Sequence, residues 1–265
     1  MQDLSVEVLM AVMNSNCKDS ISYSNLQSDA IIINQCEINK YEEEKIEDSI
    51  VRFFSVNDRG LSRSRNLALD LAKGDICLIC DDDVKYIDGY VEIVKKAFSE
   101  IKDADIIIFD SLMKKRNGEF QSCGFQMVKR IPRYKTYASC LIAFKREKIQ
   151  KNQIHFNTNF GTGSGKYSMG EEAIFLRECY KCGLKAYIFP SVIHEWDFSE
   201  TTWFEGYNRK YFNDIGAYLA ESFPYAKHFV KYYYPLRLHK ECNLRAFDVI
   251  KYINEGIRNY RINTK

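Results

Sequence analysis

The sequence has no run of 18 or more apolar residues, and its first four residues, Met1 to Leu4, carry no basic side chain. A helix that crosses a bilayer needs about 20 mostly apolar residues, and a secretory signal peptide starts with a positively charged region. We therefore expect a protein that neither spans a membrane nor is exported through a signal peptide, and we predict a cytoplasmic location.

An excess of charge of either sign is also missing. The 265 residues include 38 Lys and Arg and 36 Asp and Glu, so the formal net charge is +2. Because proteins that bind nucleic acid usually present a strongly basic face, we expect no nucleic-acid partner. The length is sufficient for a complete α/β core.

The cysteines do not form the pattern of a disulfide framework. Their number, nine, is odd, and they are scattered through predicted strands and helices, which fits a reducing compartment. Two Cys-x-x-Cys pairs are present, but Cys77 and Cys80 lie in a predicted strand, where residues three apart point to opposite faces. This pair therefore cannot converge on a tetrahedral zinc ion.

The sequence does contain a short apolar run that ends in three aspartates. Residues 76–80 predict a strand buried on both faces, and Asp81, Asp82 and Asp83 follow directly. In an open α/β sheet ligands bind at this end of the strands, and three adjacent carboxylates require a cation. Mg²⁺ or Mn²⁺ would take its remaining ligands from water and phosphate, so we predict a metal-bridged phosphate ligand. An acidic surface turn is the alternative.

Strands and helices are predicted to alternate around this strand, which indicates an α/β fold with a Rossmann-like, mostly parallel central sheet flanked by helices. Residues 40–48 are a polar, acid-rich segment, and a strand over 184–189 is expected to stop at Pro190. The pattern after residue 200 predicts a helical C-terminal extension. The other expected strands are 4–13, 30–33, 50–56 and 105–109, and a further helix is expected over 90–98.

Two of these strands stop at amide side chains, Asn14 and Gln35. Amides at strand ends can hydrogen-bond the edge of a base or a ribose. Ordinary turn chemistry explains each of them equally well.

A basic helix precedes the aspartates. We expect Ser62 as its N-cap and Gly74 at its C-terminal cap, with Arg65 beside the apolar stripe that faces the sheet. Arg59, Arg63 and Arg65 near a helix N-terminus predict a site for phosphate or carboxylate, although a solvated arginine is the usual situation for any one of them.

A glycine-rich loop leads into a second helix that begins with two glutamates. Ser168 and Glu171 have the spacing of a capping box, which gives Glu171 a structural role. Glu172 lies in the first turn, where the helix dipole favours its ionised form, as a general base requires. Dipole matching by an exposed glutamate is the alternative. His194 follows an apolar pair and is either a metal ligand or an ordinary core or surface residue.

The last 65 residues include a segment, 227–237, that mixes basic and aromatic side chains. Segments of this composition anchor proteins to membrane surfaces, so we infer a peripheral contact of the C-terminal helices with the inner face of the membrane as one interpretation. Core packing with a solvated basic face explains the pattern equally well.

Together these motifs resemble the signature of glycosyltransferase family 2 enzymes with the GT-A fold. The resemblance rests on Gly60-Leu61-Ser62-x-Ser64-Arg65-Asn66, on Gly74-Asp75 followed by the strand and the three aspartates, and on Gly170-Glu171-Glu172 with a histidine 22 residues after Glu172. It covers roughly residues 4 to 200 and is similar in particular to short bacterial enzymes from capsule and other surface-polysaccharide gene clusters.

The resemblance implies roles for single residues. Glu172 occupies the place of the catalytic base, which is usually an aspartate in the family, so the choice between Glu172 and Glu171 stays open. The implied nucleotide-sugar-binding residues are Asn14, Gln35, Arg65, Asp81 and Asp82, and the implied ligands of Mn²⁺ or Mg²⁺ are Asp83, Asp81 and His194.

The resemblance further implies a metal-dependent, inverting transfer of a sugar from a nucleotide-diphosphate donor, most commonly a UDP-sugar, to a glycan or lipid-linked saccharide acceptor in bacterial surface-polysaccharide synthesis. We expect a nucleotide-binding half (1–110), an acceptor and catalytic half (111–200) and the helical extension (201–265). The rival functions are a sugar-phosphate nucleotidyltransferase and a non-catalytic nucleotide-sugar-binding protein of the same fold.

Overall fold

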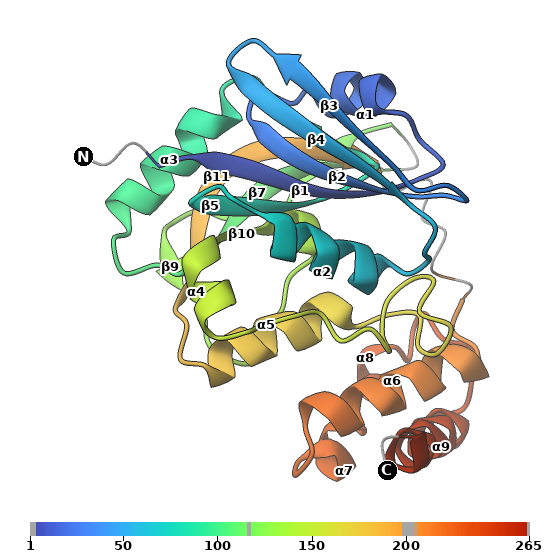
Figure 1. Cartoon of the computed structure of the whole chain (residues 1–265). Coiled ribbons are helices and arrows are strands. Elements are labelled where there is room, and N and C mark those ends of the chain that lie inside the picture. Colours follow the sequence, from blue (N-terminus) through green and yellow to red (C-terminus); the bar gives the residue numbers. More distant parts are fainter. Residues whose placement is uncertain (1–3, 116–117, 198–203, 205, 264–265) are drawn as a thin grey trace.

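The computed structural model describes residues 4–115, 118–197, 204 and 206–263, and its centre is one large mixed sheet (Figure 1). The strand order is β3-β4-β2-β1-β5-β10-β7-β11-β6, with β8 paired to β7 and β9 to β11. The strands are β1 (Val6–Met13), β2 (Asp29–Gln35), β3 (Lys40–Ile46), β4 (Ser49–Val56), β5 (Ile76–Asp81), β6 (Val84–Tyr86), β7 (Ile106–Lys114), β8 (Phe120–Ser122), β9 (Lys129–Arg130), β10 (Ile142–Lys145) and β11 (Ala186–Asp197).

Most strands of the sheet point the same way, as the sequence predicts. β4, β2, β1 and β5 are parallel neighbours, and β10 runs antiparallel between β5 and β7. β7 and β11 are parallel to each other and therefore share the direction of β5. Met13 pairs with Gln35 and Ala11 with Asp81, so the carboxyl ends of β1, β2 and β5 lie at one edge of the sheet.

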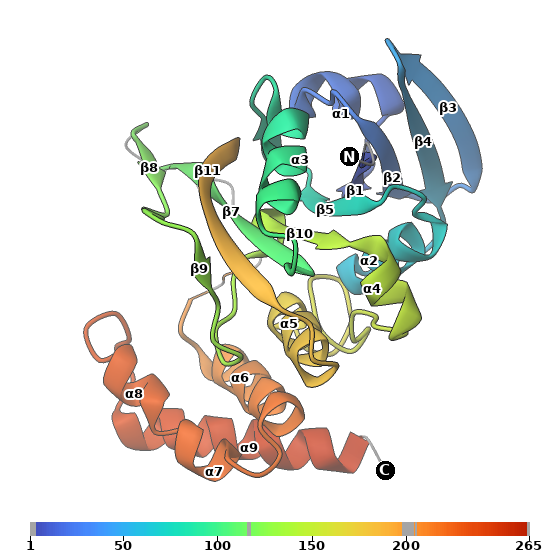
Figure 2. The same cartoon turned by 90° about the vertical axis from the view of Figure 1, so that its left-hand side faces the viewer.

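Helices cover both faces of the sheet. Figures 1 and 2 show α2, α4 and α5 on one face and α1 and α3 on the other, with the C-terminal helices beyond α5. The helices are α1 (Cys17–Ser24), α2 (Leu61–Leu71), α3 (Tyr90–Glu100), η1 (Ser139–Leu141), α4 (Arg146–Lys151), α5 (Glu171–Lys181), α6 (Arg209–Ser222), α7 (Lys227–Val230), α8 (Tyr233–Arg237) and α9 (Ala246–Asn263).

The central strand β5 is buried on both faces, which confirms the interpretation of its apolar run. Its residues 76–80 are each at most 2 % exposed. Helices on both faces of the sheet leave no position on such a strand for a polar side chain until the strand ends. The first polar side chain of the strand is therefore Asp81, at the edge of the sheet.

The ends of α2 differ from the prediction. Gly60 is the N-cap, and the hydroxyl of Ser62 donates to the carbonyl of Phe160 at 2.7 Å, so the expected Ser62 cap is wrong. The helix ends at Leu71, and Gly74 does not cap it. A Cβ on Gly74 would lie 2.6 Å from the Cβ of Glu7, so close backbone approach explains this glycine.

Two strands differ from the sequence analysis. The acid-rich segment 40–48, to which no secondary structure was assigned, contains β3, an antiparallel edge strand on β4, and charged side chains suit such an edge because they oppose pairing with other chains. β11 does not stop at Pro190 but continues to Asp197 through a register shift between Phe189 and Val192. An irregularity of this kind accommodates a residue without an N–H group.

The C-terminal helices pack on the segment before α5. Gly216 in α6 and Gly256 in α9 let the two helices approach so closely that a Cβ at either position would collide with backbone of the other helix. Their core includes Phe160, Tyr167 and Ile174. The expected boundary between residues 200 and 201 lies outside the described residues, and the division into domains stays a prediction. No helix in the described ranges is long and apolar enough to cross a membrane.

Candidate functional site

The three aspartates lie at the carboxyl edge of the sheet. Asp81 is the last residue of β5, and Asp82 and Asp83 form the turn into β6. Burial and the neighbouring carboxylates of Asp81 and Asp82 raise the pKa of Asp83 to about 7. The turn thus holds more negative charge than it can stabilise alone, which favours a cation beside Asp83.

Arg65 connects this turn with the glutamates of α5. Its side chain is 3 % exposed, and its Nη2 donates to Asp81 Oδ1 at 2.6 Å while Nη1 donates to Glu171 Oε1 at 3.2 Å. Ser139, at the start of η1, accepts from Nη2 at 2.8 Å and donates to Asp81 Oδ2 at 2.9 Å. The end of β5 and the start of α5 therefore meet on one guanidinium group.

Arg65, which the resemblance assigns to binding of the nucleotide-sugar, pairs in the structure with two carboxylates of the protein itself. Burial alone would lower the pKa of Arg65, but Asp81 and Glu171 more than offset this effect and raise it above its ordinary value. The other two arginines of the expected anion site have different partners. Arg59 contacts the sulfur of Met13, and Arg63 pairs with Asp58 at 2.8 Å.

The two glutamates occupy the first turn of α5, but no capping box forms. The N-cap is Gly170, with φ of 94°, and the hydroxyl of Ser168 donates instead to Asp214 Oδ2 at 2.8 Å. Burial and the adjacent Glu171 raise the pKa of Glu172. The helix dipole favours the ionised form of Glu172, whereas desolvation and the like charge of Glu171 act in the opposite direction.

His194 is a buried imidazole near the carboxyl end of β11. It pairs with Tyr86 of β6, is fully buried, and neither ring nitrogen has a hydrogen-bond partner among the described residues. Burial lowers its pKa to about 4, although Asp81 and Asp110 act in the opposite direction. A neutral imidazole with a free lone pair is what a metal ligand requires, and an unpaired buried nitrogen is costly otherwise.

The donor set fits a divalent cation that is completed by a ligand. Carboxylate oxygens from Asp81 and Asp83 and the imidazole of His194 are groups that bind Mn²⁺ or Mg²⁺. Within the part of the chain that the structure describes, no three or more such side chains are close enough to hold an ion by themselves. Phosphate and water oxygens would therefore supply most of the coordination sphere.

The expected base-side residues are at the same edge of the sheet. Asn14 is exposed at the end of β1, with φ of 50°, and its N–H donates to the carbonyl of Gln35 at 3.1 Å. The side-chain oxygen of Gln35 accepts from the N–H of Gly60 at 2.8 Å and so holds the start of α2. Asn14 lines a cavity of about 390 Å³, together with Asn34 and Ser55.

A sequence profile of glycosyl transferase family 2 matches residues 26–167, just over half of the chain. The chain belongs to glycosyltransferase family 2. A comparison with curated protein sequences gives no significant match.

Solved structures show the fold of this family 2 glycosyltransferase. TarS from S. aureus, residues 1–349 with UDP, superposes with a TM-score of 0.60 at 12 % identity, covering 97 % of this chain and 89 % of TarS. The same fragment with UDP-GlcNAc superposes with a TM-score of 0.55 at 13 % sequence identity. This match covers 98 % of this chain and 74 % of the TarS fragment. A longer TarS chain superposes with a TM-score of 0.58 at 12 % sequence identity. The present chain covers 44 % of that TarS chain, less than half its length.

The structure adds site residues of this glycosyltransferase that the sequence analysis missed. Asp197 ends β11, and the pairing of Trp196 with Val84 brings it beside Asp83, whose pKa it helps to raise. Asn34 is buried and joins β2 to the loop after β1 through bonds to the backbone of Ser15. No local signal marks Asp197, because its partner Asp83 is distant in the sequence. Asn34 directly follows the apolar run 30–33, so the amide at a strand end that drew attention to Gln35 also marks Asn34.

Proposed function

We propose that this family 2 glycosyltransferase transfers a sugar from a nucleotide-diphosphate donor, a UDP-sugar, to a hydroxyl group of a glycan or lipid-linked saccharide, with inversion at the anomeric carbon. The observation that carries the proposal is the contact of one guanidinium, that of Arg65, with both Asp81 and Glu171. This contact supports the proposal because it joins the aspartate turn, whose carboxylates would bind a metal and diphosphate, to the pair of glutamates that would transfer the proton. The UDP and UDP-GlcNAc complexes of TarS support the choice of donor.

The donor half of the proposed reaction uses the sheet edge. Asp81, Asp83 and His194 would hold Mn²⁺ or Mg²⁺, which supplies Lewis-acid stabilisation of the leaving diphosphate when bound. The cavity beside Asn14, of about 390 Å³, has the size and the amide groups to receive a nucleoside. Asp82 is exposed on the turn directly after Asp81.

The acceptor half uses Glu172. Its carboxylate removes the proton of the acceptor hydroxyl as the oxygen attacks the anomeric carbon, and the bond between that carbon and the diphosphate breaks from the opposite face. The raised pKa makes Glu172 a stronger base than an ordinary carboxylate once it is ionised. Glu171 is held by Arg65 and positions the pair. One displacement of this kind needs no covalent enzyme intermediate.

The rivals predict other products. A sugar-phosphate nucleotidyltransferase would release pyrophosphate from a nucleoside triphosphate, and a binding protein would retain UDP without turning over any donor. Neither rival uses a base at Glu172, and the position of this half-buried carboxylate beside the buried Glu171 favours the transferase.

The deciding experiment is a panel of nucleotide-sugar donors with Mn²⁺, with nucleoside diphosphate release as the readout. We expect removal of the metal by a chelator, or Asp83→Asn, to lower release by about 10²–10³-fold, since a bound cation contributes several kcal/mol to stabilising the leaving group. Because the pKa of Asp83 is about 7 without metal, Mn²⁺ binding is expected to tighten as the pH rises through 7. Release of pyrophosphate, or full activity in the chelator, would contradict the assignment.

We also propose a peripheral membrane contact through α7 and α8. Their outer surface exposes Tyr225, Phe229, Tyr233 and Leu236, by 95, 79, 57 and 75 %. Aromatic and leucine side chains flanked by cations fit the interface of an anionic membrane, and Lys240 and Arg245 are exposed nearby. Two of the cations in the segment 227–237 do not lie on this surface. Lys227 and Lys231 are buried, and their ammonium groups donate hydrogen bonds to Pro224 and Asn254 respectively.

A sedimentation assay with phosphatidylcholine vesicles that contain phosphatidylglycerol tests this contact. We expect Phe229→Ser combined with Leu236→Ser to weaken binding at least about tenfold, since each buried apolar side chain contributes roughly 1.5–3 kcal/mol. Phe120→Ser with Met127→Ser removes two exposed apolar side chains elsewhere and is expected to leave binding unchanged. Equal binding by the two double variants would refute the assignment of the surface.

A further inference from the structure

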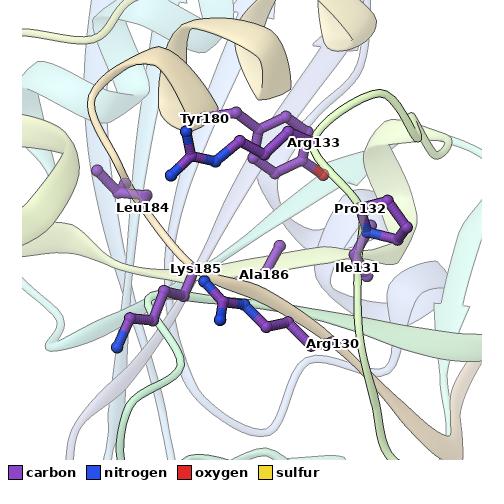
Figure 3. Close-up of a pocket in the computed structure, with 8 residues that line it drawn as sticks. All are labelled: Arg130, Ile131, Pro132, Arg133, Tyr180, Leu184, Lys185 and Ala186. Atoms are coloured by element: carbon purple, nitrogen blue, oxygen red, sulfur yellow. The ribbon is translucent and has the colours of Figure 1, made fainter.

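A second cavity lies at the other end of α5, away from the carboxylates (Figure 3). It has a volume of about 280 Å³ and is lined by Arg130, Ile131, Pro132, Arg133, Tyr180, Leu184, Lys185 and Ala186. Ala186 starts β11 and pairs with Ile106 at the start of β7. The cavity therefore opens at the edge of the sheet opposite to Asp81, where the proposed reaction uses no residue.

The cavity is lined by three cationic side chains, and the nearby carboxylate of Asp103, which pairs with Lys185 and also acts on Arg130, offsets only part of their charge. Arg130 and Arg133 are exposed, and among the described residues neither donates a hydrogen bond nor forms an ion pair, whereas Lys185 pairs with Asp103 at 3.1 Å. Figure 3 shows both guanidinium groups turned toward the segment 184–186. The C-terminal end of α5 contributes a partial charge of only about −0.5, so two full positive charges outweigh it.

The rest of the lining is apolar and well fixed. Ile131, Pro132 and Leu184 provide aliphatic surface, and Tyr180 provides a ring whose hydroxyl is already bonded to the carbonyl of Lys135 at 3.1 Å. The N–H of Ile131 donates to the carbonyl of Ala186 at 2.8 Å, which ties the two walls together. Apolar walls with two guanidinium forks suit a sugar ring that bears a phosphate group.

We infer that this cavity binds a phosphate-bearing saccharide unit of the acceptor, an inference that rests on the proposed function. Glu172 and Tyr180 are eight residues apart on α5, which is about 12 Å along the helix at 1.5 Å per residue. This separation exceeds one sugar ring, so the bound unit is remote from the reacting hydroxyl. The acceptor is accordingly an anionic chain of several units, and its remote part contributes binding energy to the transfer.

Amide NMR of the ¹⁵N-labelled protein, titrated with glucose 6-phosphate, tests the site without any donor. We expect shifts at Ile131, Leu184 and Ala186, and binding at least about tenfold weaker in Arg130→Gln combined with Arg133→Gln, because hydrogen bonds to charged groups are among the strongest. Lys96→Gln with Lys148→Gln removes two cations from other surfaces and is expected to change the affinity less than about twofold.

Two further probes separate the parts of the inference. Inorganic phosphate is expected to bind at least tenfold more weakly than glucose 6-phosphate, and methyl α-glucoside not measurably. Equal binding of phosphate and glucose 6-phosphate would reduce the site to a bare anion site, and unchanged binding in the double arginine variant would refute it. Donor hydrolysis, in which water replaces the acceptor hydroxyl and UDP is released, is expected to be equal in both double variants. Absence of nucleoside diphosphate release in the wild type with every donor of the panel and a set of saccharide acceptors would refute the proposed function and not this site.

Discussion

Glu172→Gln is expected to lower turnover by about 10²–10⁴-fold, the usual contribution of a positioned general base. Glutamine keeps the shape of the side chain but cannot accept a proton from the acceptor hydroxyl. Because burial and Glu171 raise the pKa of Glu172, the active ionised form accumulates only as the pH rises well above the ordinary glutamate range. The wild-type kcat/KM is therefore expected to increase with pH through that raised pKa, and the residual activity of the variant is expected to lack this rise.

The stability of the same variant gives an independent check. A carboxyl group whose folded-state pKa is raised stabilises the fold fully below its unfolded pKa, and this contribution is lost as the pH rises through the folded pKa. Glu172→Gln removes this loss, so the variant is expected to be at least as stable as the wild type at pH 8, measured by urea unfolding. Turnover that stays at the wild-type level would remove Glu172 from the base position, and an equally large loss in Glu171→Gln with unchanged stability would move the role to Glu171.

The sequence predicted the parts of the site that depend on strand ends. A buried apolar strand can stop only where its flanking helices leave room for polar groups, so the run 76–80 located Asp81 to Asp83 correctly at the edge of the sheet. The parallel order of the sheet then placed Asn14 and Gln35 at the same edge. These inferences need only local patterns and the rule that ligands gather at the carboxyl ends of parallel strands.

Contacts between segments that are distant in the sequence could not be predicted from local sequence patterns. Ser62 has the spacing of a helix cap, but a carbonyl 98 residues away takes its hydroxyl. Ser168 is likewise bonded to Asp214 from α6, which removes the capping box. A polar side chain can hydrogen-bond to a distant residue that the tertiary structure brings close to it. A favourable local spacing therefore predicts a capping hydrogen bond only when no distant group competes for the side chain.

Arg65 makes the most deeply buried of these contacts between distant segments. We expect Arg65→Met to lower the free energy of unfolding by about 3–5 kcal/mol, measured by urea denaturation. Methionine fills a similar volume but leaves Asp81 and Glu171, whose side chains are 28 % and 10 % exposed, without the buried cation that both contact. The cost comes mainly from the uncompensated carboxylates and not from the lost packing. Adding Glu171→Gln to Arg65→Met is therefore expected to recover part of the loss, because one orphaned charge is removed.

Arg63→Met is the matched control for this prediction. Arg63 lies two residues earlier on the same helix and also forms an ion pair, with Asp58, but its side chain is 44 % exposed against 3 % for Arg65. A surface pair of this kind contributes at most about 1 kcal/mol, so the two substitutions remove the same charge from the same helix with very different costs. Equal stability of the two variants would mean that Asp81 and Glu171 do not depend on Arg65. The single guanidinium that joins the strand end to α5 would then lose its role in bringing the two halves of the site together.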